Sequence, residues 1–399
     1  MPSVQRTLPR NPAEKNNTVM NQGKEMKRCT QCVLPEVCPG INFDSKGICN
    51  VCHDFDQRWG NFKREAASRK EQLDRTFNSY RNKSKKYDCL VPVSGGFDST
   101  YALYVCKKIY GLKTLAFNFN NGFQSEIAKQ NIQTAVKKLE VDFVTASPPW
   151  EKASKLYGLF FKKTGEFCTP CNLGIWSMSH KIAKDQGIPL IVSGSSNRIS
   201  ERLPRGRRTY SWSPSYFRQV IRGGIPTKDV KEYLYLPDNF HNSTLRKISQ
   251  RVLPYKNVNI LPLFDYIEYD IDLMLHALKV ELNWREKADT FHHIDCIMEP
   301  VNDYFRQRKW GFSAAAWYSM LVRTGQMSRD EALKLTLKEE EKNLQEPPEL
   351  ELWLELLNLS RDDLKDFEKR SQLPYFPAQD GMRNTADRIL SEITARLGL

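Results

Sequence analysis

The sequence predicts an α/β protein with a parallel sheet, a small cysteine module before the sheet and a largely helical region after it. Short apolar runs alternate with segments of helical periodicity between residues 87 and 200. Two Cys-x-x-Cys pairs lie within residues 27–56, and helical patterns dominate from residue 263 onward. Alternating strands and helices indicate a parallel sheet that is covered by helices on both faces.

The composition is that of a soluble globular enzyme with more than one domain. The chain has 399 residues, of which 40% are hydrophobic and 27% are charged. No apolar run approaches the roughly 18 residues of a membrane span, and the N-terminus lacks the apolar block of a secretory signal. We therefore expect a cytoplasmic protein in which residues 1–26 form a polar, disordered extension.

The charge is strongly positive and unevenly distributed. The formal net charge is +13, and residues 57–86 are rich in Lys and Arg. A basic front half favours phosphate-bearing ligands such as ATP, a nucleotide sugar or RNA. For residues 57–86 alone, the preferred interpretation is the solvated face of a connecting helix.

The strands and helices of the sheet region can be assigned from periodicity. Four strands are predicted at Asp88–Val93, Thr114–Asn118, Asp142–Thr145 and Pro189–Ser193. Three helices are predicted at Ser99–Tyr110, Ser125–Leu139 and Asn172–Gln186. An irregular stretch follows over residues 201–262. Ligands of such sheets bind at the carboxyl ends of the strands, at a topological switch point.

A glycine-containing motif follows the first predicted strand. It consists of Ser94, Gly95, Gly96, Phe97, Asp98, Ser99 and Thr100. Two glycines allow a tight turn, and their N–H groups with those of the next helix N-terminus form an anion-binding nest. Asp98 could hold Mg²⁺ or order the loop. The alternative is a plain glycine turn with a helix cap. The chain has no GxxxxGK[ST] motif, so a γ-phosphate-transferring P-loop is excluded.

These residues resemble the SGGxDS motif of the PP-loop ATP pyrophosphatase superfamily. The resemblance implies an ATP-binding fold that cleaves between the α- and β-phosphates, leaving an adenylylated substrate and pyrophosphate. The adenylylated oxygen then leaves as AMP when a nitrogen or sulfur nucleophile attacks.

Within this superfamily the chain most resembles the N-acetyl sugar amidotransferases of the WbpG/PseA type, over most of residues 27–335. The segments that carry the resemblance are 29–52, 87–108, 119–132, 291–293 and 321–333. It implies an enzyme of surface-polysaccharide biosynthesis. Its partners would be ATP, a nucleotide-linked N-acetyl sugar and a separate glutaminase that supplies ammonia. The sugar's acetamido group would become an acetamidino group.

The cysteine module has the spacing of a structural zinc site. Its four cysteines are Cys29, Cys32, Cys49 and Cys52, arranged as two CxxC pairs separated by 16 residues. Two such pairs direct four thiolates tetrahedrally onto one Zn²⁺. Such a closed site is structural, and Cys38 between the pairs is interpreted as a spare.

A second cysteine group departs from the sugar amidotransferases. Cys168 and Cys171 form a CxxC that we expect just before the helix leading into the fourth strand, and Cys296 follows far downstream. Some sulfur-transferring PP-loop enzymes hold a [4Fe-4S] cluster through a CxxC and one distant Cys, which leaves one iron open. The alternative is that the CxxC is a helix-capping turn and Cys296 is a buried apolar residue.

Several further residues are candidates for the site. Arg198, Arg202, Arg205, Arg207 and Arg208 follow the fourth strand, where phosphates are expected. Arg198 and Arg202 are the preferred ATP contacts by position; a solvated basic loop is the alternative. Asp98, His292 and His293 are the candidate catalytic residues. The two histidines, with Asp295, could assist acid–base steps or be purely structural.

The sequence thus predicts five segments. They are a disordered extension (1–26), a zinc module (27–56), a linker helix (57–86), a PP-loop domain (87–262) and a mostly helical region (263–399). ATP-dependent amidotransfer to an N-acetyl sugar is the leading hypothesis. Iron–sulfur-dependent sulfur transfer to a small molecule or tRNA is the second. A zinc-ribbon scaffold with an inactive nucleotide site is a third, which the intact SGGFDS disfavours.

Overall fold

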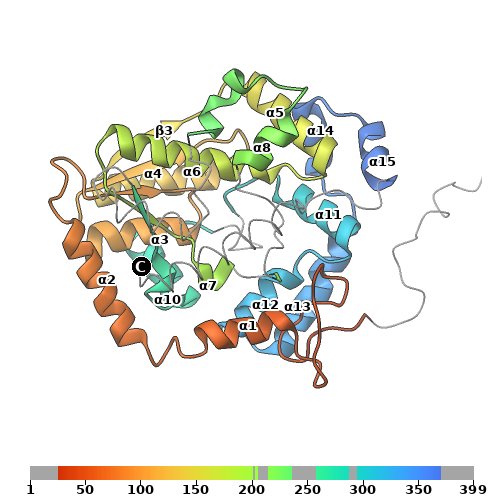
Figure 1. Ribbon diagram of the computed structural model, residues 1–399, viewed down its shortest axis with the longest axis horizontal. Coiled ribbons are helices and arrows are strands. Elements are labelled where there is room, and N and C mark those ends of the chain that lie inside the picture. The colour runs from red at the N-terminus through yellow and green to blue at the C-terminus, as the bar shows by residue number, and fades with distance from the viewer. Residues whose placement is uncertain (1–25, 201–202, 205–213, 236–257, 287–293, 370–399) are drawn as a thin grey trace, which may run out of the picture.

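The computed structural model describes residues 26–200, 203–204, 214–235, 258–286 and 294–369. It contains a five-stranded parallel sheet, which lies toward the left in Figure 1. The strands are β1 (Cys89–Pro92), β2 (Thr114–Phe119), β3 (Asp142–Ala146), β4 (Leu190–Ser193) and β5 (Asn259–Pro262). Their order is β3-β2-β1-β4-β5, and every neighbouring pair is parallel. The predicted parallel sheet is therefore confirmed.

The sheet has its topological switch point between β1 and β4. From β1 the chain proceeds through β2 to β3 on one side, and then returns to β4 and β5 on the other. The first four strands lie where the sequence predicts them. β5 was not predicted, because its four residues fall within the stretch interpreted as irregular.

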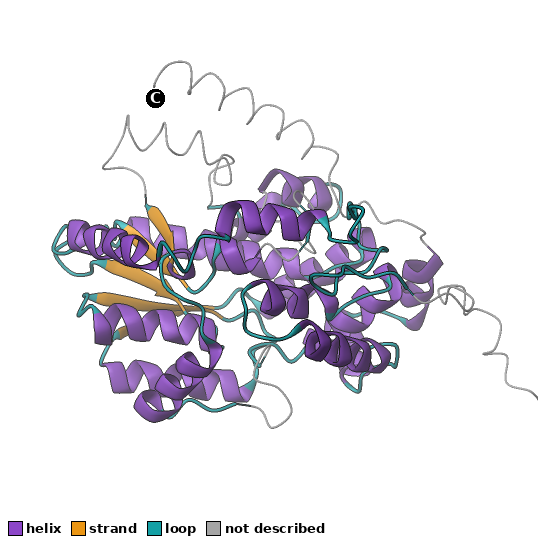
Figure 2. Ribbon diagram, turned by 90° about the horizontal axis from the view of Figure 1, so that it is seen from below, coloured by secondary structure: helices purple, strands orange, loops and turns teal. Residues whose placement is uncertain are grey.

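Helices cover both faces of the sheet, as Figure 2 shows. One face packs against α3 (Phe97–Tyr104), α4 (Glu126–Leu139) and α10 (Ile271–Leu282). The other packs against α5 (Trp150–Thr164), α6 (Cys168–Asp185) and α8 (Pro214–Ile221). Strand side chains alternate between faces, so in β1 Cys89 and Val91 join the first core and Leu90 joins the second.

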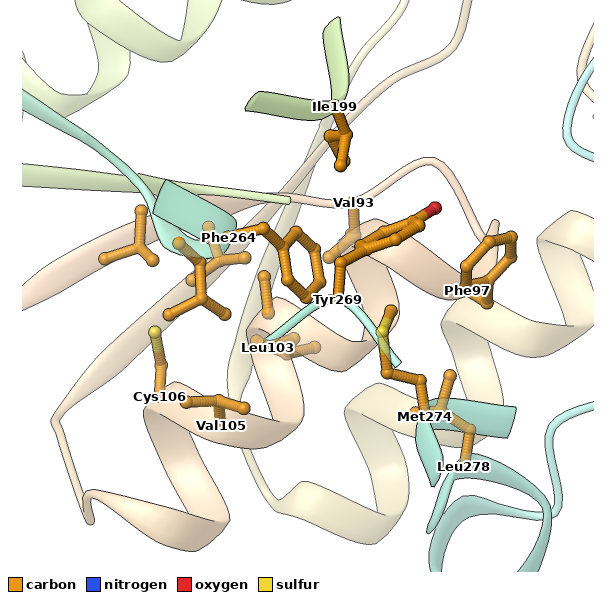
Figure 3. Close-up of a cluster of buried hydrophobic side chains, with 14 of the residues drawn as sticks. Val93, Phe97, Leu103, Val105, Cys106, Ile199, Phe264, Tyr269, Met274 and Leu278 are labelled. Carbon is orange, nitrogen blue, oxygen red and sulfur yellow. The ribbon is translucent and has the colours of Figure 1, made fainter. Parts of the chain in front are cut away.

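The first core brings the end of β1 and the start of α3 against the segment before α10. In Figure 3, Val93 and Phe97 lie with Tyr269 and Phe264 in this cluster. The Phe264 and Tyr269 rings meet edge to face with centroids 5.0 Å apart. This packing supports the strand-to-helix turn at the sheet's carboxyl edge.

Local signals account for the helix boundaries. The Ser125 hydroxyl caps α4 by accepting from the Ala128 N–H at 3.1 Å, and Glu140 ends it in the left-handed conformation at φ 50°. The expectation that the CTPC segment precedes its helix is wrong. α6 begins at Cys168, so both cysteines lie in its first turn, where Pro170 is favourable because helix N-termini tolerate a missing N–H.

The remaining described elements are shorter connections and the helices at both ends of the chain. The connections are the π-helical turn η2 (Val105–Ile109), α7 (Asn197–Ser200), η3 (Thr227–Tyr233) and η4 (Leu263–Asp265). The other helices are α1 (Asn50–Trp59), α2 (Ala66–Tyr80), α11 (Glu299–Trp310), α12 (Ala315–Arg323), α13 (Arg329–Lys342), α14 (Glu349–Leu357) and α15 (Arg361–Lys369). No helix among the described residues is both long and apolar enough to cross a membrane.

The N-terminal module packs on helices from the far end of the sequence. Figure 1 shows α1 beside α12 and α13. The Arg329 guanidinium donates to the Cys29 and Cys32 carbonyls at 3.0 and 3.1 Å. Arg28 forms a buried ion pair of 2.7 Å with Glu340. The cysteine module and the C-terminal helices therefore form one structural unit.

Gly174 in α6 provides a test of the packing between this helix and the sheet. A Cβ at Gly174 would lie 2.3 Å from the Phe119 ring, which is enclosed in the second core. We expect Gly174→Ala to lower the free energy of unfolding by about 1–3 kcal/mol, because overpacking outweighs the helical preference of alanine. Urea denaturation measures the change. Lys184→Ala, on the exposed side of the same helix, is the control; equal stability of the two variants would contradict this packing.

Candidate active site and metal centre

The SGGFDS loop joins β1 to α3 at the carboxyl edge of the sheet. Gly95 has φ 91°, and a Cβ there would lie 2.3 Å from the Ala128 carbonyl oxygen. Only glycine satisfies both constraints. The Ser94 N–H donates to the Ser99 hydroxyl at 3.0 Å, and Thr100 Oγ1 donates to the Gly96 carbonyl at 2.8 Å. The loop is therefore built tightly around the N-terminus of α3, an anion-binding arrangement.

Three side chains from other elements hold the carbonyl groups of this loop. Trp284 Nε1 and Asn131 Nδ2 donate to the Gly95 carbonyl at 3.0 and 3.3 Å, and Gln124 Nε2 donates to that of Ser94 at 3.0 Å. Sequence reasoning did not identify these residues. Only Asn131 offered a signal in the sequence, because it is a polar residue on the otherwise apolar face of α4. In the structure it is 2% exposed.

The end of β4 packs directly on the start of α3. A Cβ at Gly194 would lie 2.6 Å from the backbone carbon and oxygen of Asp98. The backbone after β4 thus reaches the first turn of α3. Such close approach of two backbones requires glycine. As a result, the segments that follow β1 and β4, the two strands at the switch point, lie at the same site.

A cavity of about 610 Å³ opens at this edge of the sheet. Its volume is in the usual range of small-molecule sites. Its walls come from the loop, from the segment after β2, from α6 and α11, and from the N-terminal module. The predicted loop residues that line it are Ser94, Gly96, Phe97, Asp98 and Ser99.

Residues 294–297 lie beside the SGGFDS loop because their backbone pairs with the segment after β2. Cys296 forms an isolated antiparallel bridge with Gln124, and the Ser125 N–H donates to the Asp295 carbonyl at 3.2 Å. A Cβ at Gly96 would lie 3.6 Å from the Asp295 carboxylate. Asp295 is thus placed beside the loop. The predicted catalytic residues His292 and His293 lie outside the described residues.

Cys168, Cys171 and Cys296 all line the cavity. Asn121 Nδ2 lies 3.0 Å from the Cys171 sulfur. Burial raises the pKa of Cys171 to about 12 and that of Cys168 and Cys296 well above the usual thiol value. Without a metal these sulfurs are therefore protonated near neutral pH. The structure places all three cysteines on the wall of the cavity that the loop also lines.

The three sulfurs are nevertheless too far apart to surround one ion. Across the described residues, the N-terminal cysteines are the only Cys, His, Asp or Glu group of three or more whose ligand atoms all lie within 4.8 Å of one another. Cluster thiolates bind different irons, so their sulfurs are more widely spaced than those around a single zinc ion. Cys168, Cys171 and Cys296 therefore do not form a compact site for a single ion.

The four N-terminal sulfurs do converge. Those of Cys29, Cys32, Cys49 and Cys52 lie within 4.8 Å of one another, and all four residues are fully buried. The Cys29 sulfur accepts backbone N–H groups of Gln31, Cys32 and Cys49 at 3.2 to 3.4 Å. Contacts with the other three side chains lower the pKa of Cys29. The predicted four-ligand metal site is therefore formed; four thiolates suit zinc.

The arginines that were predicted to bind phosphate occupy other positions or lie outside the described residues. Arg198 does not line the cavity. Its guanidinium lies 3.7 Å from the Phe62 ring centroid, and its Nη1 lies 3.6 Å from Glu268 Oε1. Burial lowers the pKa of Arg198. Arg202, with Arg205, Arg207 and Arg208, falls outside the described residues.

A parallel sheet with an SGGxDS loop at its switch point defines a PP-loop type of protein. Residues 285–385 match the family model described as "LPS biosynthesis protein WbpG-like, C-terminal domain". This match confirms the predicted resemblance to WbpG-type PP-loop proteins. The fold and this match together indicate a PP-loop enzyme.

Two individual proteins are also similar to this chain. An uncharacterized protein of Methanocaldococcus jannaschii, MJ1599, is 24% identical over 168 residues, which are 42% of this chain and 58% of that protein. The U34-tRNA thiolase NcsA from Methanococcus maripaludis, solved with its [4Fe-4S] cluster, is 13% identical. The superposition covers 80% of this chain and 88% of NcsA with a TM-score of 0.33.

Removal of one sulfur tests the metal centre. We expect the purified protein to contain one Zn²⁺, and Cys32→Ser to lose the metal and about 4 kcal/mol or more of unfolding free energy, since metal loss is among the largest single-site effects. Elemental analysis and urea denaturation measure both. The control is Cys38→Ser: Cys38 is also buried in the module but is outside the four-sulfur group. Full metal content in Cys32→Ser would contradict the site.

Proposed function

We propose that the protein is a cytoplasmic, ATP-dependent amidotransferase that converts the acetamido group of a nucleotide-linked N-acetyl sugar into an acetamidino group. One observation carries the proposal: the SGGFDS loop and residues of the WbpG-like domain line the same cavity. A nucleotide bound at the SGGFDS loop would therefore lie in the same cavity as a substrate that contacts the WbpG-like segment, residues 285–385. The WbpG-like match supports a sugar of lipopolysaccharide biosynthesis as that substrate.

The proposed reaction has two steps. The amide oxygen of the acetamido group attacks the α-phosphorus of ATP, the bond to the β-phosphate breaks, and pyrophosphate leaves. Ammonia then adds to the amide carbon, and the bond from that carbon to the adenylylated oxygen breaks to release AMP. The products are the amidine, AMP, pyrophosphate and one proton, with no oxidation or reduction.

The loop and its neighbours have distinct roles in these steps. Backbone N–H groups at the N-terminus of α3 bind phosphate oxygens, as helix N-termini do. Asp98, in the first turn of α3 and on the cavity wall, would hold the Mg²⁺ that accompanies the nucleotide and neutralises charge on the leaving pyrophosphate. Asp295, beside Gly96, is placed to accept a proton from the attacking ammonia. A separate glutaminase would supply the ammonia.

The experiment follows nucleotide products with sugar and ammonium present. We expect AMP and pyrophosphate in equal amounts, formed only when a nucleotide-linked N-acetylhexosamine is added. Gly95→Ala should lower this rate at least a hundredfold, because its Cβ would collide with the Ala128 carbonyl and displace the loop. The matched control is Gly111→Asn. That position has φ 60° and open space, which asparagine tolerates. Stoichiometric ADP would exclude this chemistry.

Sulfur transfer to a small molecule or tRNA is a second candidate function. The observation that favours it is the presence of Cys168, Cys171 and Cys296 on the wall of the same cavity. Three thiolates would hold a [4Fe-4S] cluster and leave one iron open for sulfide. In that case sulfide, rather than ammonia, would attack the adenylylated carbon.

Anaerobic purification distinguishes the two candidates. Under sulfur transfer, the protein should be brown and contain about four irons per chain, and Cys296→Ala should lose the colour while retaining the zinc. Under amidotransfer without a cluster, the protein should be colourless and Cys296→Ala should support turnover. A colourless protein after anaerobic iron–sulfur reconstitution would exclude the second candidate.

A further inference from the structure

We propose that the sugar ring of the acceptor binds to the cavity wall formed by α1 of the cysteine module and residues 310–317, with Arg58 and Trp310 as its specificity-determining residues. The inference rests on the proposed function and extends it, since it names the residues that bind the sugar. Both residues line the cavity. Arg58 follows the four metal-ligand cysteines in the chain, and Trp310 belongs to the WbpG-like domain.

One face of α1 forms a wall of this cavity. Val51, Asp54 and Arg58 line it, and their spacing of three and four residues places them on a single helical face. Val51 and Cys52 are also part of the buried module core, at 4% and 0% exposure, whereas Asp54 and Arg58, one turn apart, are only half-buried. The module core thus fixes the start of α1 and leaves Asp54 and Arg58 at the cavity.

The part of the cavity wall formed by residues 310–317 is aromatic. Trp310, Phe312 and Trp317 line the cavity, and the Trp310 and Phe312 rings have centroids 6.4 Å apart with planes inclined at 34°. Phe312 also packs in the hydrophobic cluster of the metal-site cysteines. A tryptophan ring offers a large apolar face with a polar N–H at its edge. Such a face stacks on the C–H side of a pyranose ring.

Charged groups of both signs accompany the aromatic wall. Asp54, Arg58 and Glu339 line the cavity with it, and Arg58 Nε donates to the Asp54 carbonyl at 3.1 Å. Carboxylates accept hydrogen bonds from sugar hydroxyls, and arginine donates to hydroxyl and acetamido oxygens. Mixed charge beside aromatic rings suits an uncharged, hydroxylated ring better than a triphosphate, which belongs at the helix N-terminus of the PP-loop.

The backbone of the aromatic wall is anchored to the module. The Glu340 carboxylate accepts from the backbone N–H groups of Ser313 and Ala315 at 3.4 and 3.3 Å, while it pairs with Arg28 next to the first metal ligand. The Val33 N–H donates to the Ser319 hydroxyl at 3.1 Å. The two walls are therefore set relative to each other by buried polar contacts, which pre-organise a binding site.

The test uses UDP-N-acetylglucosamine and α,β-methylene-ATP as separate probes in calorimetric titrations of the zinc-loaded full chain. We expect Trp310→Leu and Arg58→Gln each to weaken the sugar nucleotide about tenfold or more, with the ATP analogue unchanged. Trp310→Phe, which retains an aromatic face, should restore most of the affinity. Arg75→Gln, on the exposed side of α2, should change neither affinity.

The outcomes separate this site from the proposed reaction. Unchanged sugar affinity in Trp310→Leu and Arg58→Gln, or no binding of the sugar probe to the parent protein, would overturn the site. Equal weakening of both probes would also overturn it, because the residues would then only support the fold. Sugar binding that depends on Trp310 without any release of pyrophosphate would retain the site and remove the amidotransferase reaction.

Discussion

The site depends on close backbone contacts at the switch point of the sheet. The loop after β1 presses on α4 at Gly95, and the segment after β4 presses on α3 at Gly194. Neither position has room for a side chain. The carboxyl ends of β1 and β4 therefore both lie at the N-terminus of α3. Trp284 and Asn131 then hold the Gly95 carbonyl from the outside. The anion-binding geometry is thus fixed by packing before a ligand arrives, which is the condition for electrostatic pre-organisation.

The second constraint is the packing of the N-terminal cysteine module on α13, which lies about 300 residues later in the chain. The cysteine module would be a poor domain alone, because its core is little more than its four sulfurs and a few apolar residues. Arg329 and the Arg28–Glu340 ion pair attach it to α13. Breaking one partner of such a buried pair costs more than the pair contributes. The attachment gives the cavity a wall that the sheet domain alone does not supply.

Features with local signals were predictable from sequence, and those that depend on distant contacts were not. The SGGFDS loop and the four-cysteine module each carry their chemistry in a short stretch of residues, so their identity and approximate geometry followed directly. β5 has only four residues and no flanking pattern. Its assignment requires its partner β4, whose Leu190 pairs with Asn259. The start of α6 at Cys168 was missed because Pro170 resembles a helix breaker unless it is placed in the first turn.

The same distinction applies to the site residues. Position after the fourth strand selected Arg198 as an ATP contact, but its guanidinium lies against Phe62 and Glu268, a contact between segments far apart in sequence. The sequence grouped Cys296 with the distant CxxC as possible ligands of one cluster, and all three cysteines line the same cavity. The pairing of residue 296 with Gln124, which places Cys296 there, could not be read from either segment alone.

The proposed function requires that the acetamido oxygen of the acceptor is adenylylated by ATP within this cavity. The most direct measurement follows an oxygen-18 label placed in the acetamido carbonyl of the sugar. If the amide oxygen attacks the α-phosphorus and ammonia later replaces it, every AMP formed in a complete turnover carries the label and the amidine product carries none. Unlabelled AMP, with the label retained in the sugar, would contradict the account.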